Sequence, residues 1–203
     1  MNYFVTAIHT DSGKTLVSAI LCEALHADYW KPVQAGFPTD SETVANLVSN
    51  ASTKIHAEAY LLKKPASPHA AAKAESIEIR RENFILPRIG HDLIIEGAGG
   101  CLVPLAKDFF VVDLIDKFKA EVILVSNLYL GSINHTLLTV EALKNRKINI
   151  KGIIFNGEPN PESESIILST TKLPLLLHIL PETIITKEVV LRYAQQLKKN
   201  LHV

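Results

Sequence analysis

The architecture of this chain is set near its amino terminus by residues 3–15, which read Tyr-Phe-Val-Thr-Ala-Ile-His-Thr-Asp-Ser-Gly-Lys-Thr. The apolar run Tyr3–Thr6 predicts a buried strand. The stretch Lys14–His26 predicts a helix, because its apolar side chains recur every three or four residues. Between them, Gly13-Lys14-Thr15 is the ending of a Walker A phosphate loop. The sequence therefore predicts a nucleotide-binding site between a first strand and a helix.

The residue types in this loop suit the binding of a triphosphate. Backbone N–H groups can wrap the phosphates, and the helix N-terminus adds positive potential. We expect Lys14 to reach the β- and γ-phosphates and Thr15 to give its hydroxyl to Mg²⁺. Gly-Lys-Thr alone also fits a polar turn before a helix. The leading glycine of the usual pattern is missing, since Ala7 and Ile8 stand in its place.

Short apolar runs alternate with helical patterns along the rest of the chain. Strands are predicted over Tyr29–Val33, Asp92–Glu96, Val122–Ser126, Gly152–Asn156 and Leu175–Ile179. Helices are predicted over Thr43–Ser49, Phe110–Phe118, Ile133–Asn145, Glu162–Thr170 and Lys187–Lys199. Only a short helix near Ala70–Ala74 is predicted within Ser52–Pro87. Wholly apolar strands indicate a mostly parallel sheet covered by helices on both faces, so we expect one doubly wound α/β domain over residues 1–203.

Composition excludes several other classes of protein. The 203 residues are 47% hydrophobic and carry 21 basic and 21 acidic side chains. Because basic residues are not in excess, the composition does not indicate a surface that binds nucleic acid or a membrane. Two cysteines make neither a disulfide framework nor a zinc site. The opening residues do not resemble a signal peptide, and a cytoplasmic protein is expected.

Further charged residues follow the predicted strands, where ligands of such sheets bind. Lys31 lies in an apolar strand and could neutralise a transferred phosphoryl group, although a lysine reaching solvent from a strand end is the commoner case. Glu96 ends a strand before a glycine run, as a Walker B carboxylate does, or it simply caps a turn. Asp40 is a second candidate for the metal, with Glu42 as its competitor, but Asp before a helix is ordinarily an N-cap.

Together these segments resemble the dethiobiotin synthetase family over most of the chain. The matching blocks are Gly13–Thr15, Lys31-Pro32-Val33-Gln34-Ala35-Gly36, Pro65-Ala66-Ser67-Pro68-His69-Ala70-Ala71, Glu96-Gly97-Ala98-Gly99-Gly100 and Gly131–Thr139. The first and fourth blocks also occur in other phosphate-loop enzymes. The second, third and fifth blocks are specific to the family, and they stand in the family's order.

The resemblance implies an enzyme that uses Mg²⁺ and ATP to close a ureido ring on 7,8-diaminopelargonate with CO₂. It implies catalytic roles for Lys14 and Lys31, and metal binding by Thr15, Asp40 and Glu96. It places nucleotide at Asp11, Ser12, Gly13, Lys14, Thr15, Leu16, Asp40, Glu96, Gly97, Ala98, Gly99, Asn156, Gly157 and Pro181. It places substrate at Thr10, Lys31, Ala35, Gly36, Gly100, Ser132 and Asn134. It also implies a homodimer with the site at its interface.

The strongest rival is a partner-regulated ATPase of the partitioning or metallocluster-carrier class. Those proteins usually place a lysine early in the loop, where this chain has His9, and a metallocluster carrier would also need a Cys-x-x-Cys pair. Asn156 resembles the adenine-reading asparagine of the synthetases, yet an Asn in a turn before Pro159 is nearly as good an explanation.

The nucleotide base is expected to be selected loosely. Gly157 follows Asn156 where an acid is expected, and Pro181-Glu182 is the only trace of the usual base-binding end. Because few side chains remain to read a purine, ATP, GTP and CTP should support ring closure with similar kcat/KM. A strong preference for ATP in that comparison would contradict the prediction.

Overall fold

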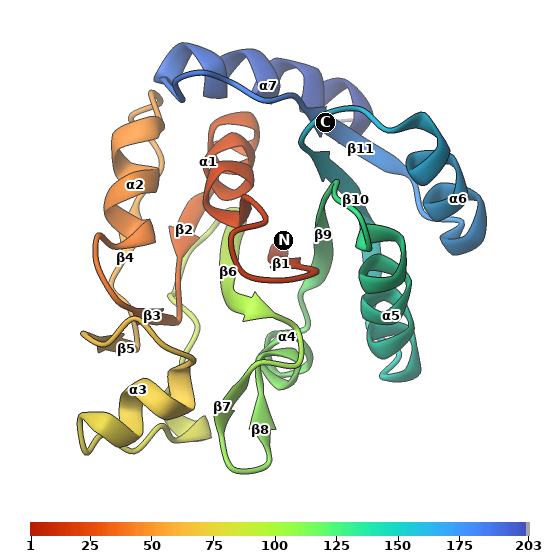
Figure 1. The fold of residues 1–203 in the computed structure, drawn as a ribbon. Coiled ribbons are helices and arrows are strands. Elements are labelled where there is room, and N and C mark those ends of the chain that lie inside the picture. Colours follow the sequence, from red (N-terminus) through yellow and green to blue (C-terminus); the bar gives the residue numbers. More distant parts are fainter. Residues whose placement is uncertain (202–203) are drawn as a thin grey trace.

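The computed structural model describes residues 1–201, and Figure 1 shows a central sheet between layers of helices. The sheet has seven strands in the order β11-β10-β9-β1-β6-β2-β4, and every pairing within it is parallel. Its strands are β1 (Asn2–Ala7), β2 (Asp28–Trp30), β4 (Ile55–His56), β6 (Leu93–Gly100), β9 (Glu121–Asn127), β10 (Ile150–Asn156) and β11 (Leu175–Ile179). The predicted fold class, a mostly parallel α/β sheet flanked by helices, is confirmed.

The described residues form seven α-helices. They are α1 (Lys14–Leu25), α2 (Asp40–Leu47), α3 (Pro68–Ala74), α4 (Val111–Phe118), α5 (Ser132–Asn145), α6 (Pro161–Thr171) and α7 (Lys187–Leu201). A 3₁₀ turn, η1, spans Arg81–Asn83. A small parallel pair joins β3 (Val33–Ala35) to β5 (Tyr60–Leu62), and a hairpin joins β7 (Pro104–Ala106) to β8 (Phe109–Phe110).

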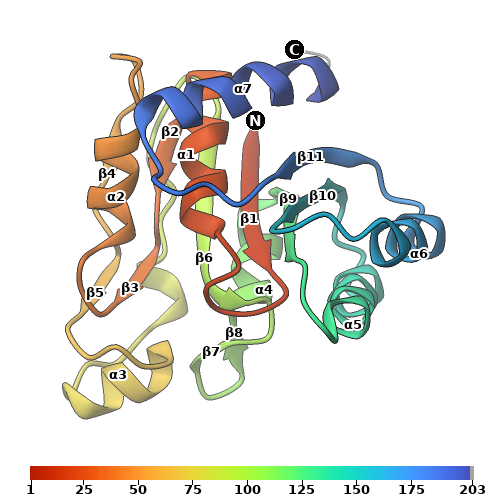
Figure 2. The ribbon, with the colours of Figure 1, turned by 45° about the horizontal axis from the view of Figure 1, so that its top comes forward.

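The core lies on both faces of the sheet because successive strand residues point to opposite sides. In β1, Tyr3 and Val5 pack in one cluster with α1 and α7, whereas Phe4 packs in the other with α4 and α5. Figure 2 shows α1 and α7 on one side and α5 and α6 beside β9 and β10. Burial on both faces explains why these strands are apolar throughout.

The structure corrects two local predictions. The predicted strand Tyr29–Val33 is two strands, β2 in the main sheet and β3 in the small one, interrupted at Lys31-Pro32. Proline lacks the N–H that would continue the ladder, so the chain leaves the main sheet there. The stretch Ser52–Pro87 contains β4, β5 and η1 besides the expected helix, and its strands are only two or three residues long. Such short strands have no readable periodicity.

Element boundaries also moved near the site. Helix α2 begins at Asp40 rather than Thr43, because Thr39 caps it with a hydroxyl that accepts from the Glu42 N–H. Strand β6 continues through the glycine run to Gly100 rather than ending at Glu96. Within residues 1–201, no helix is both long enough and apolar enough to span a bilayer.

A buried carboxylate stabilises the sheet near its edge strand β4, at the end of β2 away from the phosphate loop. Asp28, which begins β2, accepts hydrogen bonds from the Lys54 N–H at 2.9 Å, His56 Nε2 at 2.7 Å and His91 Nε2 at 2.9 Å. Burial alone would raise the pKa of Asp28, but these donors outweigh it and hold that pKa below its usual range. The ionised form is therefore the stabilising one.

We expect Asp28→Asn to lower the free energy of unfolding at pH 7 by about 1–3 kcal/mol, since it disrupts a buried acceptor of three hydrogen bonds. A lowered carboxyl pKa contributes stability above its unfolded value of about 3.9, and this is lost as pH falls through the folded value. The difference between variant and wild type in urea unfolding should therefore shrink below about pH 4. The exposed Asp116→Asn is the control, and equal stability of Asp28→Asn and wild type at pH 7 would contradict the prediction.

Candidate active site

The phosphate loop connects β1 to α1 and bends through two residues with positive φ, Asp11 at 59° and Gly13 at 95°. The Ser12 hydroxyl donates to the His9 carbonyl at 3.0 Å, and Lys14 Nζ donates to the same oxygen at 3.4 Å. Ala7 belongs to β1 and pairs with Gly100 and Val125. Since Ala7 keeps ordinary strand geometry, the missing leading glycine does not strain this loop.

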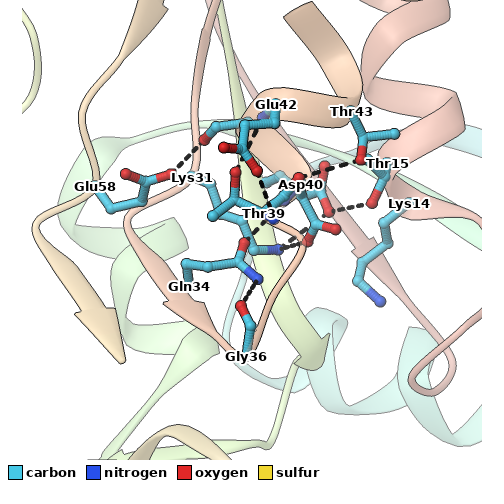
Figure 3. A network of polar contacts seen from close by, with 12 residues as sticks. Lys14, Thr15, Lys31, Gln34, Gly36, Thr39, Asp40, Glu42, Thr43 and Glu58 are labelled. Atoms are coloured by element: carbon cyan, nitrogen blue, oxygen red, sulfur yellow. Dashed lines mark hydrogen bonds and ion pairs between the residues drawn. The ribbon is translucent and has the colours of Figure 1, made fainter. Parts of the chain in front are cut away.

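Lys31 is held between two carboxylates at the carboxyl end of the sheet strands. Its side chain is buried, and its Nζ lies 2.5 Å from Asp40 Oδ2 and 3.1 Å from Glu96 Oε1. Figure 3 shows Lys31, Asp40 and Thr15 in one polar network with Lys14 beside them. The lysine comes directly after β2, Asp40 begins α2, and Glu96 lies within β6. Three elements therefore meet at one ammonium group, and the commoner explanation of a solvated lysine does not apply.

Glu96 connects this cluster to the phosphate-loop helix. The Thr15 hydroxyl donates to its Oε1 at 3.0 Å, and the Tyr29 hydroxyl donates to its Oε2 at 3.0 Å. Burial, followed by the charge of Glu96, raises the pKa of Tyr29 well above its usual value, so the phenol stays a donor. Glu96 is 1% exposed, which excludes a role as an exposed turn cap.

The geometry also separates Asp40 from Glu42. The Glu42 carboxylate accepts from the Thr39 N–H at 3.2 Å and completes the capping box of α2. Asp40, in contrast, lines the cavity, and its own N–H donates to Gln34 Oε1 at 3.1 Å. Gln34 in turn donates to the Gly36 carbonyl at 3.0 Å, which ties α2 to the turn after β3. Asp40 is therefore better placed than Glu42 for a ligand in this cavity.

The oxygen donors present suit Mg²⁺. Within residues 1–201 there is no group of three or more His, Cys, Asp or Glu side chains arranged to hold a metal. Mg²⁺ is usually bound by one or two carboxylates together with substrate phosphates and waters, rather than by an all-protein cage. Thr15, Asp40 and Glu96 supply a hydroxyl and two carboxylates beside the phosphate loop, so the donor set fits that mode.

These groups line a cavity of about 800 Å³. It brings together the predicted site residues Thr10, Asp11, Gly13, Lys14, Thr15, Lys31, Ala35, Gly36, Asp40, Glu96, Ala98 and Gly99. A hollow of about 960 Å³ between α3, η1 and the β7–β8 hairpin is larger, but none of the predicted site residues lines it. We therefore assign the site to the smaller cavity, where the charged groups converge.

Nine predicted site residues do not line this cavity: Ser12, Leu16, Gly97, Gly100, Ser132, Asn134, Asn156, Gly157 and Pro181. Ser132 and Asn134 lie in the first turn of α5, and Asn156 ends β10. Asn156 Nδ2 donates to the Ser12 carbonyl at 2.9 Å, so it contacts the back of the loop. The roles predicted for these residues remain predictions.

The fold brings to the site some residues that carry no signal of their own in the sequence. The sequence predicts Tyr29 only as a strand residue, although its hydroxyl donates a hydrogen bond to Glu96. Gln34 and the segment 65–68 line the cavity, and the only signal for them was their place in the Lys-Pro and Ser-Pro-His blocks. An uncharged side chain whose partner is distant in sequence carries no local signal of its role.

The two lysines differ in their electrostatic surroundings. Burial, with a contribution from the charge of Lys31, lowers the pKa of Lys14 even though Glu96 opposes the change. Burial alone would lower the pKa of Lys31 too, but Glu96 and Asp40 outweigh it and raise that pKa above its usual value. Burial would likewise raise the pKa of Asp40, and Lys31 reverses the direction. Lys31 therefore stays charged, whereas the charged form of Lys14 is disfavoured by burial until an anion binds beside it.

Known proteins resemble this chain over nearly its whole length. A family described as an AAA domain matches residues 1–189. An ATP-dependent dethiobiotin synthetase from Cytophaga hutchinsonii is 62% identical over 200 residues, which cover 98% of this chain and 97% of that protein. The chain belongs to this AAA domain family and to the ATP-dependent dethiobiotin synthetases. A synthetase from Christiangramia forsetii is 48% identical over 202 residues, which cover 98% of this chain and 97% of that protein.

Solved structures show the same fold in other phosphate-loop ATPases. The septum site-determining protein MinD from Pyrococcus horikoshii superposes with a TM-score of 0.57 at 16% identity, over 99% of this chain and 95% of that one. A ParA family ATPase from Chlorobium tepidum gives 0.52 at 15% identity, over 98% and 96%. At such identities the likeness shows the fold alone. The membership in the synthetase family rests on the much closer relatives.

The pKa difference between the lysines predicts a difference in chemical reactivity. Acylating reagents attack the neutral amine, so acetic anhydride at about pH 8 should acetylate Lys14 well before Lys31, whose raised pKa keeps it protonated. Peptide mass spectrometry would measure both rates against the exposed Lys119. Acetylation of Lys31 as fast as Lys14 would contradict the assigned surroundings.

Proposed function

We propose that this chain is the enzyme that closes the ureido ring of dethiobiotin, using ATP, CO₂ and 7,8-diaminopelargonate and releasing ADP and phosphate. The observation that carries the proposal is the buried Lys31 ammonium, held by Asp40 and Glu96 in the same cavity as Lys14 and the phosphate loop. The dethiobiotin synthetases that match nearly the full chain at up to 62% identity point to the same activity.

The chemistry needs positioning and charge neutralisation rather than a protein nucleophile. One substrate amine combines with CO₂ to give a carbamate, whose oxygen attacks the γ-phosphorus of ATP, and ADP leaves. The second amine then attacks the carbonyl carbon of the carbamoyl phosphate, and phosphate departs as the ring closes. Negative charge gathers at the transferred phosphoryl group in both steps, and fixed ammonium groups stabilise such charge strongly in a site shielded from water.

Several residues of the cavity take part in this scheme. Lys14 and the loop N–H groups hold the β- and γ-phosphates, and Lys31 neutralises the phosphoryl group as it moves. Thr15, Asp40 and Glu96 would hold Mg²⁺, which supplies further positive charge to the phosphates. Thr10, Ala35 and Gly36 line the same cavity and would contact the diamine.

The remaining assignments rest on the family resemblance. Asn156, Gly157 and Pro181 would lie at the base end of ATP. Gly100, Ser132 and Asn134 would bind substrate, and Ser132 and Asn134 belong to the block that fits a site at a homodimer interface. A helix N-terminus suits a carboxylate, and the Ser132 hydroxyl at the start of α5 is buried without a hydrogen-bond partner among the described residues. Sedimentation of the purified chain would test the dimer, and titration with EDTA would test the need for Mg²⁺.

A partner-regulated ATPase is the less favoured function. Its only structural support is the fold shared with MinD and ParA proteins, and that likeness does not extend to sequence. The two functions differ in what triggers hydrolysis. Release of phosphate from ATP should require both the diamine and bicarbonate, whereas release with neither would favour the regulated ATPase.

Replacing either lysine should abolish most of the activity. We expect Lys31→Ala and Lys14→Ala each to lower kcat for ring closure by about 10²–10³-fold, as loss of a group that stabilises transition-state charge does. Turnover would be followed by incorporation of labelled CO₂ into dethiobiotin.

Two controls make that measurement specific. Lys119→Ala changes an exposed lysine in a surface ion pair and should leave kcat unchanged. Circular dichroism should show that both active-site variants remain folded. Near wild-type turnover by folded Lys31→Ala would refute the role given to Lys31.

A further inference from the structure

Two asparagines lie side by side behind the phosphate loop. Asn127 ends β9 and Asn156 ends β10, and the two are register partners in the parallel ladder. Both side chains contact the loop that follows β1, although 118 and 144 residues separate them from their partners in sequence. Neither asparagine lines the cavity in front of the loop.

Asn156 holds one particular peptide group of the loop. Its Nδ2 donates to the Ser12 carbonyl at 2.9 Å. A peptide group is planar and trans, so its C=O and the following N–H point in opposite directions. With the Ser12 oxygen held toward β10, the N–H of Gly13 is directed away from Asn156. Gly13 itself lines the cavity, where phosphate would lie.

The contact is tight enough to specify the residue at position 13. A Cβ added to Gly13 would stand 2.4 Å from Asn156 Nδ2, closer than Cβ atoms approach non-bonded heavy atoms in proteins, and the φ of 95° also disfavours a side chain. The absence of a side chain at Gly13 thus makes room for Asn156 and also permits the backbone bend.

Asn127 holds the opposite end of the loop. Its Nδ2 lies 3.1 Å from His9 Nε2, and the His9 ring stands edge-on to Tyr129 with centroids 5.2 Å apart. The carbonyl of the same histidine receives the Ser12 hydroxyl and the Lys14 ammonium. Fixing His9 therefore also fixes the oxygen to which Lys14 is anchored.

We propose that Asn127 and Asn156 are positioning residues that brace the phosphate loop, with Asn156 orienting the Ser12–Gly13 peptide so that its N–H faces the phosphates. The proposal rests on the proposed function only in that this loop binds the triphosphate of ATP. It goes beyond the base contact expected from the family, because a brace acts on the phosphates whatever the base. The second N–H and the carbonyl of the Asn156 amide stay available for a base.

The experiment separates the brace from base reading by using a ligand without a base. Binding of Mg-ATP and of Mg-tripolyphosphate would be measured by calorimetry for the wild type and for Asn156→Ala. A matched variant, Asn145→Ala, makes the same substitution at an exposed position of α5. Hydrogen exchange of the Ser12 and Gly13 amides in the unliganded protein would report on the loop directly.

If Asn156 braces the loop, Asn156→Ala should weaken both ligands by the same factor, about tenfold, because the unbraced loop must then be ordered when either ligand binds. The loop amides should exchange faster, and kcat should fall together with affinity, since the γ-phosphate is less well placed. Asn145→Ala should match the wild type in every measurement. Asn127→Ala should also speed exchange of the loop amides.

Two results would overturn the proposal. One is a loss confined to ATP, with tripolyphosphate binding unchanged, which would make Asn156 a base contact only. The other is unchanged exchange of the Ser12 and Gly13 amides in folded Asn156→Ala. A wild-type protein that forms no dethiobiotin would count against the proposed function instead, and the exchange measurement would still decide the brace.

Discussion

The arrangement of the elements around the phosphate cavity depends on one buried ammonium group, that of Lys31. Lys31 is surrounded by protein and balanced by Asp40 and Glu96, so β2, α2 and β6 can be displaced only by leaving a buried charge uncompensated. Breaking one partner of such a pair typically costs about 3–5 kcal/mol. The capping box of α2, the Gln34 bridge and the Tyr29 hydroxyl all serve to hold the two carboxylates at that ammonium.

The order of strands places the phosphate loop between two kinds of support. Strand β1 lies between β6 and β9, so the loop that follows it is flanked on both sides. Toward β6 and β2 lie the charged groups, Glu96 and Lys31, which face the cavity. Toward β9 and β10 lie the uncharged amides of Asn127 and Asn156, which contact the loop from behind. Charge is thus concentrated where a phosphate would sit, and neutral groups hold the backbone.

The fold by itself does not determine what the site does. MinD and ParA proteins share this sheet and its covering helices with little sequence identity. In the present chain a lysine, Lys31, follows the end of β2, lines the phosphate cavity and is kept protonated by its neighbours. Such a group has a clear use where a phosphoryl group leaves ATP for an acceptor supplied by the substrate.

The sequence by itself determined the doubly wound sheet and the phosphate loop, because apolar strands and a glycine-lysine-threonine turn are local patterns. It also determined the family, through the blocks Lys31–Gly36, Pro65–Ala71 and Gly131–Thr139. It could not place the break at Pro32 or the short strands within Ser52–Pro87, where neither length nor periodicity distinguishes strand from loop. Only the tertiary structure placed Asp40 on the cavity and Glu42 in the capping box of α2, and brought Tyr29 into contact with Glu96 and Asn127 and Asn156 into contact with the phosphate loop. The physical reason is that a hydrogen bond between residues distant in sequence depends on how strands pair, and strand order is a property of the whole chain.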